Sequence, residues 1–247
     1  MAMSLADKVA MVTGGSRGIG AAIAKRLARE GASVAITYAG SPQKAQEVVT
    51  SIEADQRRAL AIRADSADAE AVRNAVHETV RTLGRLDVLV SNAGIAIVKP
   101  IEEYPLEDFD RMVAVNVRGA FVAAQEASRH MAQGGRIIII GSINADYVPF
   151  QGGSVYAMTK AAVAGLTRGL ARDLGPRGIT VNNVQPGPTD TDMNPAGGQF
   201  ADLVKGTIAV GRYAQADEIA AMVAYLAGPE AGFVTGASLT IDGGASA

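Results

Sequence analysis

Apolar runs alternate with helix-length segments along this chain, and this order constrains the fold more than any other feature. Seven short runs rich in Val, Ile, Leu and Ala are typical of strands, at 9–13, 33–37, 59–63, 86–90, 136–140, 180–185 and 238–242. Helical segments lie between them, at 19–29, 42–54, 69–83, 109–132, 155–174 and 217–226. Strands that are apolar on both faces and alternate with helices indicate a parallel sheet covered on both sides.

The organisation of the chain favours one domain. No Pro- or Gly-rich linker separates two halves, so residues 1–247 are expected to form a single unit that carries both the cofactor and the substrate site. The expected fold class is α/β, with a doubly wound, seven-stranded parallel sheet and helices on both faces. A closed eight-stranded barrel is the alternative, but it would need another strand.

Composition excludes several functions. A chain of 247 residues that is 48% hydrophobic and 19% charged, with net charge -2, is globular and has no basic stripe for nucleic acid. It contains no apolar run long enough to span a membrane, and its start lacks a signal-peptide pattern, so a cytoplasmic location is expected. The absence of cysteine removes thiolate chemistry. Only His77 and His130 offer imidazole, both in helical patterns, and no metal site is predicted.

A glycine-rich turn follows the first expected strand and leads directly into a helix. It reads Thr13-Gly-Gly-Ser-Arg-Gly-Ile-Gly20, and the glycines compared with the dinucleotide pattern are Gly14, Gly18 and Gly20. Backbone N–H groups and the positive end of the helix dipole face a ligand there, and glycines let a pyrophosphate approach, as in Rossmann-type dinucleotide sites. The turn also contains a formal G-x-S-x-G motif around Ser16. A hydrolase would need a histidine on a loop at a strand end, and neither histidine follows a strand.

Tyr156 and Lys160 stand four residues apart in a segment expected to be helical. They therefore share one helix face, which brings the phenol and the ammonium within reach of each other. A phenol has a pKa of about 10, and a nearby cation lowers it, so the pair is typical of a tuned acid/base. The alternative to a catalytic pair is a structural one, in which the tyrosine packs on the core and the neighbouring lysine extends its charged end to solvent.

With Asn92, Ala93 and Gly94, Asn116 and Ser142 in order before this pair, the chain resembles the short-chain dehydrogenase/reductase family over essentially its whole length. The resemblance implies a catalytic tetrad of Asn116, Ser142, Tyr156 and Lys160. It also implies the following cofactor contacts: Gly14, Ser16, Arg17, Gly18, Ile19, Gly20, Tyr38, Ser41, Asp65, Ser66, Asn92, Ala93, Gly94, Tyr156, Lys160, Pro186, Gly187, Thr189 and Thr191. Among them, Asp65 is expected at the adenine, and Pro186, Gly187 and Thr191 at the nicotinamide.

The chemistry of the tetrad follows from its residue types. Hydride transfer to a carbonyl builds negative charge on its oxygen, and Ser142 can donate a hydrogen bond to that oxygen. Tyr156 supplies the proton, or removes it in the oxidative direction, and Lys160 is expected to lower the pKa of Tyr156 with help from the positive charge of the oxidised nicotinamide. The resemblance further implies that Lys160 binds the nicotinamide ribose and that Asn116 holds a water linking Lys160 to solvent.

The loop between Ser142 and Tyr156 departs from the family pattern. The two residues are fourteen positions apart (156 − 142), one more than is usual, and Gly152 and Gly153 could absorb the insertion.

The expected cofactor is NADP(H) rather than NAD(H). The second strand ends at Tyr38, where an acidic residue would bind the ribose hydroxyls of NAD. Arg17 in the glycine turn and Ser41 can reach the same region.

The expected substrate is a ketone or aldehyde of modest size, or the matching alcohol. The site wall is mostly apolar, without a basic residue to clamp an acid, and consists of Ile95, Ile143, Tyr147, Phe150, Met193 and Phe200. Similarity to 3-oxoacyl-thioester reductases keeps a β-keto thioester open. The segment 193–200 contains two glycines and is expected to be a mobile lid.

Two further expectations concern partners. Small residues along the segment 161–171, together with the resemblance, suggest a homotetramer of twofold symmetry. The segment 172–192 resembles a branch that includes a proposed cyclic-di-GMP-binding regulator, so a binding protein on the same fold is the alternative function. Intact Ser142, Tyr156 and Lys160 favour an enzyme.

Overall fold

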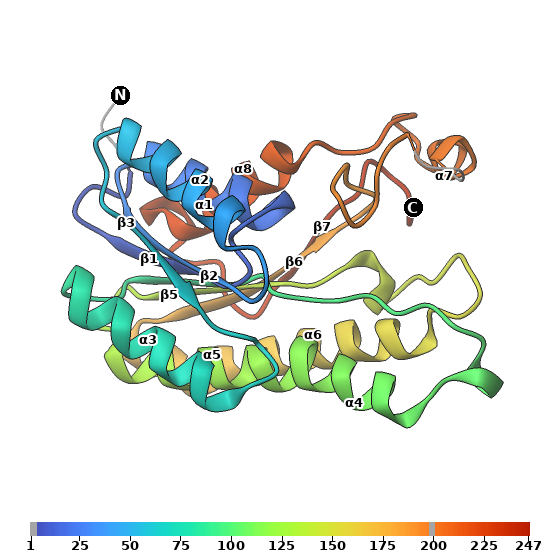
Figure 1. The fold of residues 1–247 in the computed structure, drawn as a ribbon, viewed down its shortest axis with the longest axis horizontal. Helices are drawn as coiled ribbons and strands as arrows, with labels where there is room; N and C mark the ends of the chain where they lie inside the picture. Colours follow the sequence, from blue (N-terminus) through green and yellow to red (C-terminus); the bar gives the residue numbers. More distant parts are fainter. Residues whose placement is uncertain (1–3, 198–200) are drawn as a thin grey trace.

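An open sheet lies between two layers of helices in the computed structural model (Figure 1), which describes residues 4–197 and 201–247. Over these residues the sheet has seven parallel strands in the order β3-β2-β1-β4-β5-β6-β7. The strands are β1 (Val9–Val12), β2 (Ser33–Tyr38), β3 (Ala59–Arg63), β4 (Val88–Ser91), β5 (Arg136–Ile140), β6 (Thr180–Pro186) and β7 (Ser238–Ile241). The predicted doubly wound sheet is confirmed. The barrel is wrong, because β3 and β7 stand at opposite edges.

The helices divide between the two faces of the sheet (Figure 1). One face is covered by α1 (Gly18–Arg29), α2 (Pro42–Ala54) and α8 (Ala216–Ala227), and the other by α3 (Ala69–Leu83), α5 (Gly119–His130) and α6 (Ser154–Leu174). Strand β5 shows why its sequence is apolar at successive positions. Ile138 and Ile140 pack on the first layer, whereas Ile137 and Ile139 pack on the second.

The long helix expected at 109–132 is interrupted, and this part of the prediction is wrong in detail. The chain forms α4 (Leu106–Val113), a π-helical turn (Ala114–Arg118) and then α5. A π turn inserts a wider loop of backbone into a helix and is frequent at functional sites. Another short helix, α7 (Ala201–Thr207), was not predicted. Within the described ranges, none of these helices combines the length and hydropathy needed to cross a bilayer.

The direction of the strands determines where ligands can bind. Because the strands are parallel, the segments that follow β1, β4, β5 and β6 all emerge at the same edge of the sheet. Ligands of open α/β sheets bind at this carboxyl edge. The glycine turn follows β1, Asn92 follows β4, Ser142 comes shortly after β5, and Gly187 follows β6. The fold thus gathers the predicted site residues from distant parts of the chain.

Replacing Ile138 by alanine tests the packing of the central strands. Ile138 is 1% exposed, so the truncation removes apolar contacts and leaves a cavity. We expect a loss of about 2–5 kcal/mol in the free energy of unfolding, measured by urea denaturation at fixed protein concentration. The matched change Leu106→Ala, at a side chain that is 79% exposed, should cost no more than about 0.5 kcal/mol. Equal losses in both variants would contradict the assigned core.

Candidate active site

The glycine turn after β1 has a backbone that favours glycine at two key points. Gly14 and Gly18 have φ angles of +63° and +54°, in the left-handed region. A Cβ at Gly20 would lie 2.4 Å from the carbonyl oxygen of Gly14. The first N–H groups of α1 have no acceptor within the helix, and the side chain of Arg17, the residue before it, does not cap them. The turn therefore fits the predicted pyrophosphate site.

Asn92 holds the glycine turn in place. Its side-chain amide donates to the carbonyl oxygens of Thr13 (2.9 Å) and Gly14 (3.1 Å). The Thr13 hydroxyl in turn accepts from the backbone N–H groups of Asn92 (2.9 Å) and Ala93 (3.0 Å). These bonds give Asn92 a positioning role that its predicted cofactor contact does not include. Thr13 was missed as a site residue, although it ends the run that leads into the turn.

The segment after β6 lies across the glycine turn. A Cβ at Gly18 would be 3.4 Å from the Cγ2 atom of Thr191. The neighbouring Asp192 pairs with Lys44 at the start of α2, with 2.7 Å between Nζ and Oδ2. The hydrogen bond from Lys44 lowers the pKa of Asp192, and the charges of Lys44 and Arg17 contribute in the same direction. Arg17 and Lys44 therefore form a basic rim at this end of the cleft. Lys44 was not predicted to take part.

Asp65, the predicted adenine contact, is held against the neighbouring helices. Its carboxylate pairs with Arg111 of α4 at 2.9 Å and accepts from the N–H of Ala67 at 2.9 Å. Burial raises the pKa of Asp65, but these two partners more than offset it, and the net pKa is lowered. A Cβ at Gly119 would lie 2.4 Å from the carbonyl oxygen of Ser66, so this segment packs tightly on α5. The adenine contact itself stays a prediction.

Ser142 and Tyr156 meet above the end of β5. Ser142 is 7% exposed, and its hydroxyl oxygen accepts from the Asn144 N–H at 3.1 Å. Burial raises the pKa of Tyr156, and a hydrogen bond with Ser142 offsets part of that rise. The structure thus brings together the two hydroxyls predicted to act on the substrate oxygen.

Lys160 lies one turn further along α6 and is 6% exposed. Its ammonium donates to the carbonyl oxygen of Ile140 at 2.9 Å and lies 5.6 Å from the centre of the Tyr156 ring. Burial lowers the pKa of Lys160 to about 8. The predicted proximity of the pair is confirmed, but the predicted lowering of the Tyr156 pKa is wrong for this structure. The reason is that burial disfavours the phenolate more than the surroundings favour it.

Asn116 sits in the π turn and joins two parts of the site. Its side chain accepts from the N–H of Ile95 and donates to the carbonyl oxygen of Ile95, both at 2.9 Å. It also donates to the Thr159 hydroxyl at 3.0 Å, and that hydroxyl donates to the carbonyl oxygen of Tyr156 at 2.7 Å. Asn116 therefore positions the segment after β4 against α6. Its predicted water stays a prediction, and Thr159 was missed.

The residues predicted to lie against the nicotinamide follow β6 directly. Pro186 ends that strand, and the N–H of Gly187 donates to the carbonyl oxygen of Ile241 in β7 at 3.0 Å. A Cβ at Gly187 would lie 2.5 Å from the Cβ of Asp242, so the backbone approaches closely. Thr189 is buried and donates to the carbonyl oxygen of Gly187 at 3.0 Å. These contacts fix the segment on the same edge of the sheet as Ser142.

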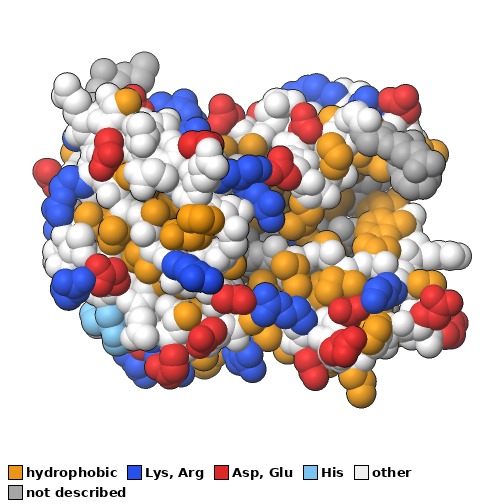
Figure 2. Space-filling model, viewed as in Figure 1, with side chains coloured by type: hydrophobic (Ala, Val, Ile, Leu, Met, Phe, Trp, Pro, Cys, Tyr) orange, Lys and Arg blue, Asp and Glu red, His pale blue; other side chains and the backbone are white. Residues whose placement is uncertain are grey.

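The mouth of the site is apolar. Figure 2 shows a hollow lined by hydrophobic side chains between the parts of the surface that carry α7 and α4. Of the predicted wall, Ile143 is buried, whereas Tyr147, Phe150 and Met193 are exposed. Phe200, and with it the end of the predicted lid, lies outside the described residues.

A groove at this mouth runs between the segments 98–102 and 151–154. Lys99 lines it, but the ammonium is held by Asp108 at 2.5 Å. Gly152 has a φ of +80°, and its carbonyl oxygen accepts from the Lys99 N–H at 3.3 Å. The longer loop before Tyr156 thus packs against the segment after β4.

Comparisons with known proteins agree with this geometry. A protein-family model described as enoyl-(acyl carrier protein) reductase matches residues 14–246. A short-chain dehydrogenase/reductase from Serratia marcescens has a solved structure that is 61% identical, with a TM-score of 0.97 and coverage of 99% of this chain and 100% of that one. The chain belongs to the short-chain dehydrogenase/reductase family.

Other relatives in the short-chain dehydrogenase/reductase family are informative about ligands. The structure of one from Burkholderia cenocepacia, in complex with NADP, is 57% identical with a TM-score of 0.98 and covers 99% of this chain and 100% of that one. A cyclic-di-GMP-binding biofilm dispersal mediator protein from Escherichia coli is 50% identical over 236 residues, 96% of each chain.

Lys160 links the stability of the fold to pH. Its pKa falls from 10.5 to about 8 on folding. Between these values the unfolded chain binds more protons than the folded protein, so the free energy of unfolding rises with pH. We expect the stability of the parent relative to Lys160→Met to increase across this window by up to about 3 kcal/mol, at about 1.4 kcal/mol per pKa unit. Urea unfolding at a series of pH values measures the difference.

Lys99→Met is the control for this series. The hydrogen bond to Asp108 raises the pKa of Lys99 above 10.5. As the pH rises toward 10.5 and beyond, the free energy of unfolding of the parent can therefore only fall relative to that of Lys99→Met. This change is opposite in sign to the one expected for Lys160. A difference between parent and Lys160→Met that is constant or falls with pH would contradict the buried ammonium.

Proposed function

We propose that this protein is an NADP(H)-dependent oxidoreductase that interconverts ketones or aldehydes and alcohols. The observation that carries the proposal is the convergence of Ser142, Tyr156 and Lys160 at the carboxyl edge of the sheet that also carries the glycine turn. Membership of an oxidoreductase family supports it. The fold alone would not support this proposal, since one fold serves many functions.

Each side chain has a distinct task in this reaction. The bound nicotinamide supplies the hydride or accepts it. The Ser142 hydroxyl donates to the substrate oxygen, where negative charge develops during reduction. Tyr156 donates the proton to the same oxygen as general acid, since its phenol is protonated at neutral pH, as that of any tyrosine is. Lys160 uses one of its three N–H donors on Ile140 and has others to offer to a ribose hydroxyl.

The basic rim supports NADP(H) as the cofactor. Arg17 and Lys44 are exposed beside the glycine turn, and β2 ends at Tyr38 without an acidic residue. A 2′-phosphate would gain the Arg17 cation there, with Lys44 shared with Asp192, whereas an acid at the end of β2 would repel it. The bound NADP in the Burkholderia cenocepacia relative is consistent with this choice.

The substrate we propose is an apolar carbonyl compound or its alcohol. Exposed Tyr147 and Phe150 and buried Ile143 offer apolar surface next to Ser142. Lys99 is engaged by Asp108, so it does not offer a free clamp for an acid. A β-keto thioester also fits this description. A homotetramer stays a prediction, in keeping with the exposed Phe121 and Met158 on α5 and α6.

A regulatory protein that binds cyclic-di-GMP is the second candidate. It is favoured by the name of the Escherichia coli relative, which is 50% identical over 236 residues. The exposed Arg17 could bind a phosphate of such a ligand as well as that of NADP. A sensor has no need of the Tyr156 hydroxyl, so substitution of that group distinguishes the two candidates.

Removal of the Tyr156 hydroxyl tests the proposed reaction. With NADPH and a panel of ketones and aldehydes, we expect Tyr156→Phe to lower kcat by about 10²–10⁴-fold, the usual contribution of a general acid. The control is Tyr225→Phe, the same change on α8, where the side chain is 47% exposed; it should leave kcat unchanged. Turnover by Tyr156→Phe within a few-fold of the parent would contradict the assignment. A parent that binds cyclic-di-GMP but turns over no carbonyl or alcohol would favour the second candidate.

Arg17→Ala tests the choice of cofactor. We expect the parent to have a higher kcat/KM with NADPH than with NADH. The variant should lose at least about tenfold with NADPH, as expected for one charge-assisted contact, and little with NADH. Arg29→Ala, at the other end of α1, is the control and should change neither value. Equal or better kcat/KM of the parent with NADH would contradict the proposal.

A further inference from the structure

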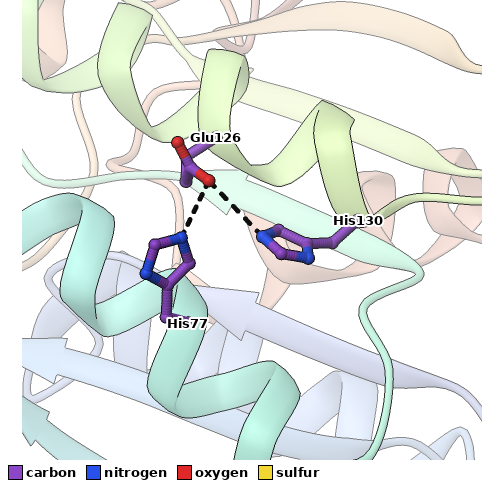
Figure 3. A group of neighbouring side chains, drawn as sticks. All are labelled: His77, Glu126 and His130. Atoms are coloured by element: carbon purple, nitrogen blue, oxygen red, sulfur yellow. Dashed lines mark hydrogen bonds and ion pairs between the residues drawn. The ribbon is translucent and has the colours of Figure 1, made fainter.

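The two histidines of the chain lie far apart in sequence but converge on the carboxylate of Glu126 (Figure 3). His77 lies on α3, and Glu126 and His130 lie one turn apart on α5. His77 Nε2 is 2.9 Å from Glu126 Oε1, and His130 Nε2 is 3.4 Å from the same oxygen. The candidate ligand atoms of the three residues all lie within 4.8 Å of one another. The hydrolase alternative gains no support, because both imidazoles face this carboxylate.

The carboxylate at the centre is buried and ionised. Glu126 is 4% exposed. Burial raises its pKa, but the hydrogen bond to His77 and the charge of Arg129 more than offset this, and the net pKa is lowered. Arg129 takes the other oxygen, Oε2, at 2.6 Å. Oε1 is thereby left to face the two imidazole nitrogens.

The arrangement has the composition and spacing of a zinc site. Two imidazoles and one carboxylate are a known ligand set for Zn²⁺, with metal–ligand distances of about 2.0–2.2 Å. Ligands at tetrahedral angles and these distances are about 3.3–3.5 Å from one another. The two contacts to Oε1 are close to that separation. To admit the ion, the His77 imidazole would withdraw slightly from Oε1, and the candidate ligand atoms, now within 4.8 Å of one another, would close to these separations.

We propose that His77, Glu126 and His130 form a Zn²⁺ site between α3 and α5, with a fourth position open to water. We place the open position on the solvent side of the site, because the His77 side chain is 53% exposed. Histidine side chains reach the surface in Figure 2. This proposal departs from the sequence-based expectation that the chain has no metal site.

The ion would join two helices that begin at the cofactor edge of the sheet. Helix α3 starts after Asp68, which caps it and lies three residues beyond Asp65. Helix α5 continues from the π turn that contains Asn116. The proposed role is structural: the ion fixes the middle of α3 against the C-terminal end of α5. The site is independent of the proposed reaction.

Zinc binding by the full, tag-free protein tests the proposal. After removal of metal with a chelator, isothermal titration with ZnCl₂ should show one ion per chain, and the ion should raise the Tm. The variants His77→Gln and His130→Gln keep a polar side chain beside Glu126 but remove one imidazole each. We expect each to weaken Zn²⁺ binding by at least about tenfold, and the double variant to abolish it together with the rise in Tm.

Two controls separate ligation from general effects. Arg129→Gln alters the partner of Glu126 but keeps all three ligands, so Zn²⁺ should bind at least as tightly as in the parent. Mg²⁺, which prefers oxygen ligands and keeps its waters, should not raise the Tm. No binding by the parent, undiminished binding by the double histidine variant, or an equal rise in Tm with Mg²⁺ would each overturn the proposal.

Discussion

The parallel direction of all seven strands is the constraint on which the site depends. It places four chain segments at one edge of the sheet, although they come from residues near 14, 92, 142 and 187. Burial of both faces of β5 then fixes where Ser142 lies along the carboxyl edge of the sheet, because Ile137 to Ile140 pack alternately on the two helix layers. A slip of this strand by one residue would place either Arg136 or Gly141 at a position now held by a buried isoleucine and would shift Ser142 along the edge. The core therefore positions the chemistry as directly as any hydrogen bond does.

Burial also governs the electrostatics of the site. The same desolvation raises the pKa of Tyr156 and lowers that of Lys160, so the protein by itself favours the uncharged form of both groups. Proximity of a cation does not reverse this, because the effect of burial on Tyr156 is the larger one. A phenol that remains protonated suits reduction. For oxidation the phenolate must become accessible, and the positive charge of the oxidised cofactor is the group that would favour it.

The fold could be predicted from sequence because its signals are local. The run 136–140 is apolar at successive positions, which predicts a strand buried on both faces. Gly14, Gly18 and Gly20 predict the anion turn because they lie between the first strand and a helix, although the first gap is longer than in G-x-G-x-x-G. The π turn could not be predicted, since its sequence is compatible with an ordinary helix and it is stabilised by contacts of Asn116 with Ile95, 21 positions away. Thr13 was missed because its hydroxyl accepts from Asn92, which follows β4 and is 79 positions distant.

The histidine cluster illustrates the same limit. Each histidine lies in a helical pattern that says nothing about its partner, and only the packing of α3 on α5 brings His77 to Glu126. The lysine–tyrosine pair was predicted as neighbours from helix geometry alone, and they are neighbours. Its electrostatic consequence was not predictable, because the sequence does not reveal how deeply the pair is buried.

The pKa of Tyr156 is the measurement that tests this description most directly. With ¹³C-labelled tyrosine, the chain gives six ring signals, and Tyr156→Phe identifies the one of interest. We expect this phenol to titrate above the usual pKa of about 10 in the protein alone, and at a lower pH once NADP⁺ is added. A Tyr156 that titrates at the ordinary value and does not respond to NADP⁺ would contradict its assignment as the buried proton-transfer group beside the cofactor.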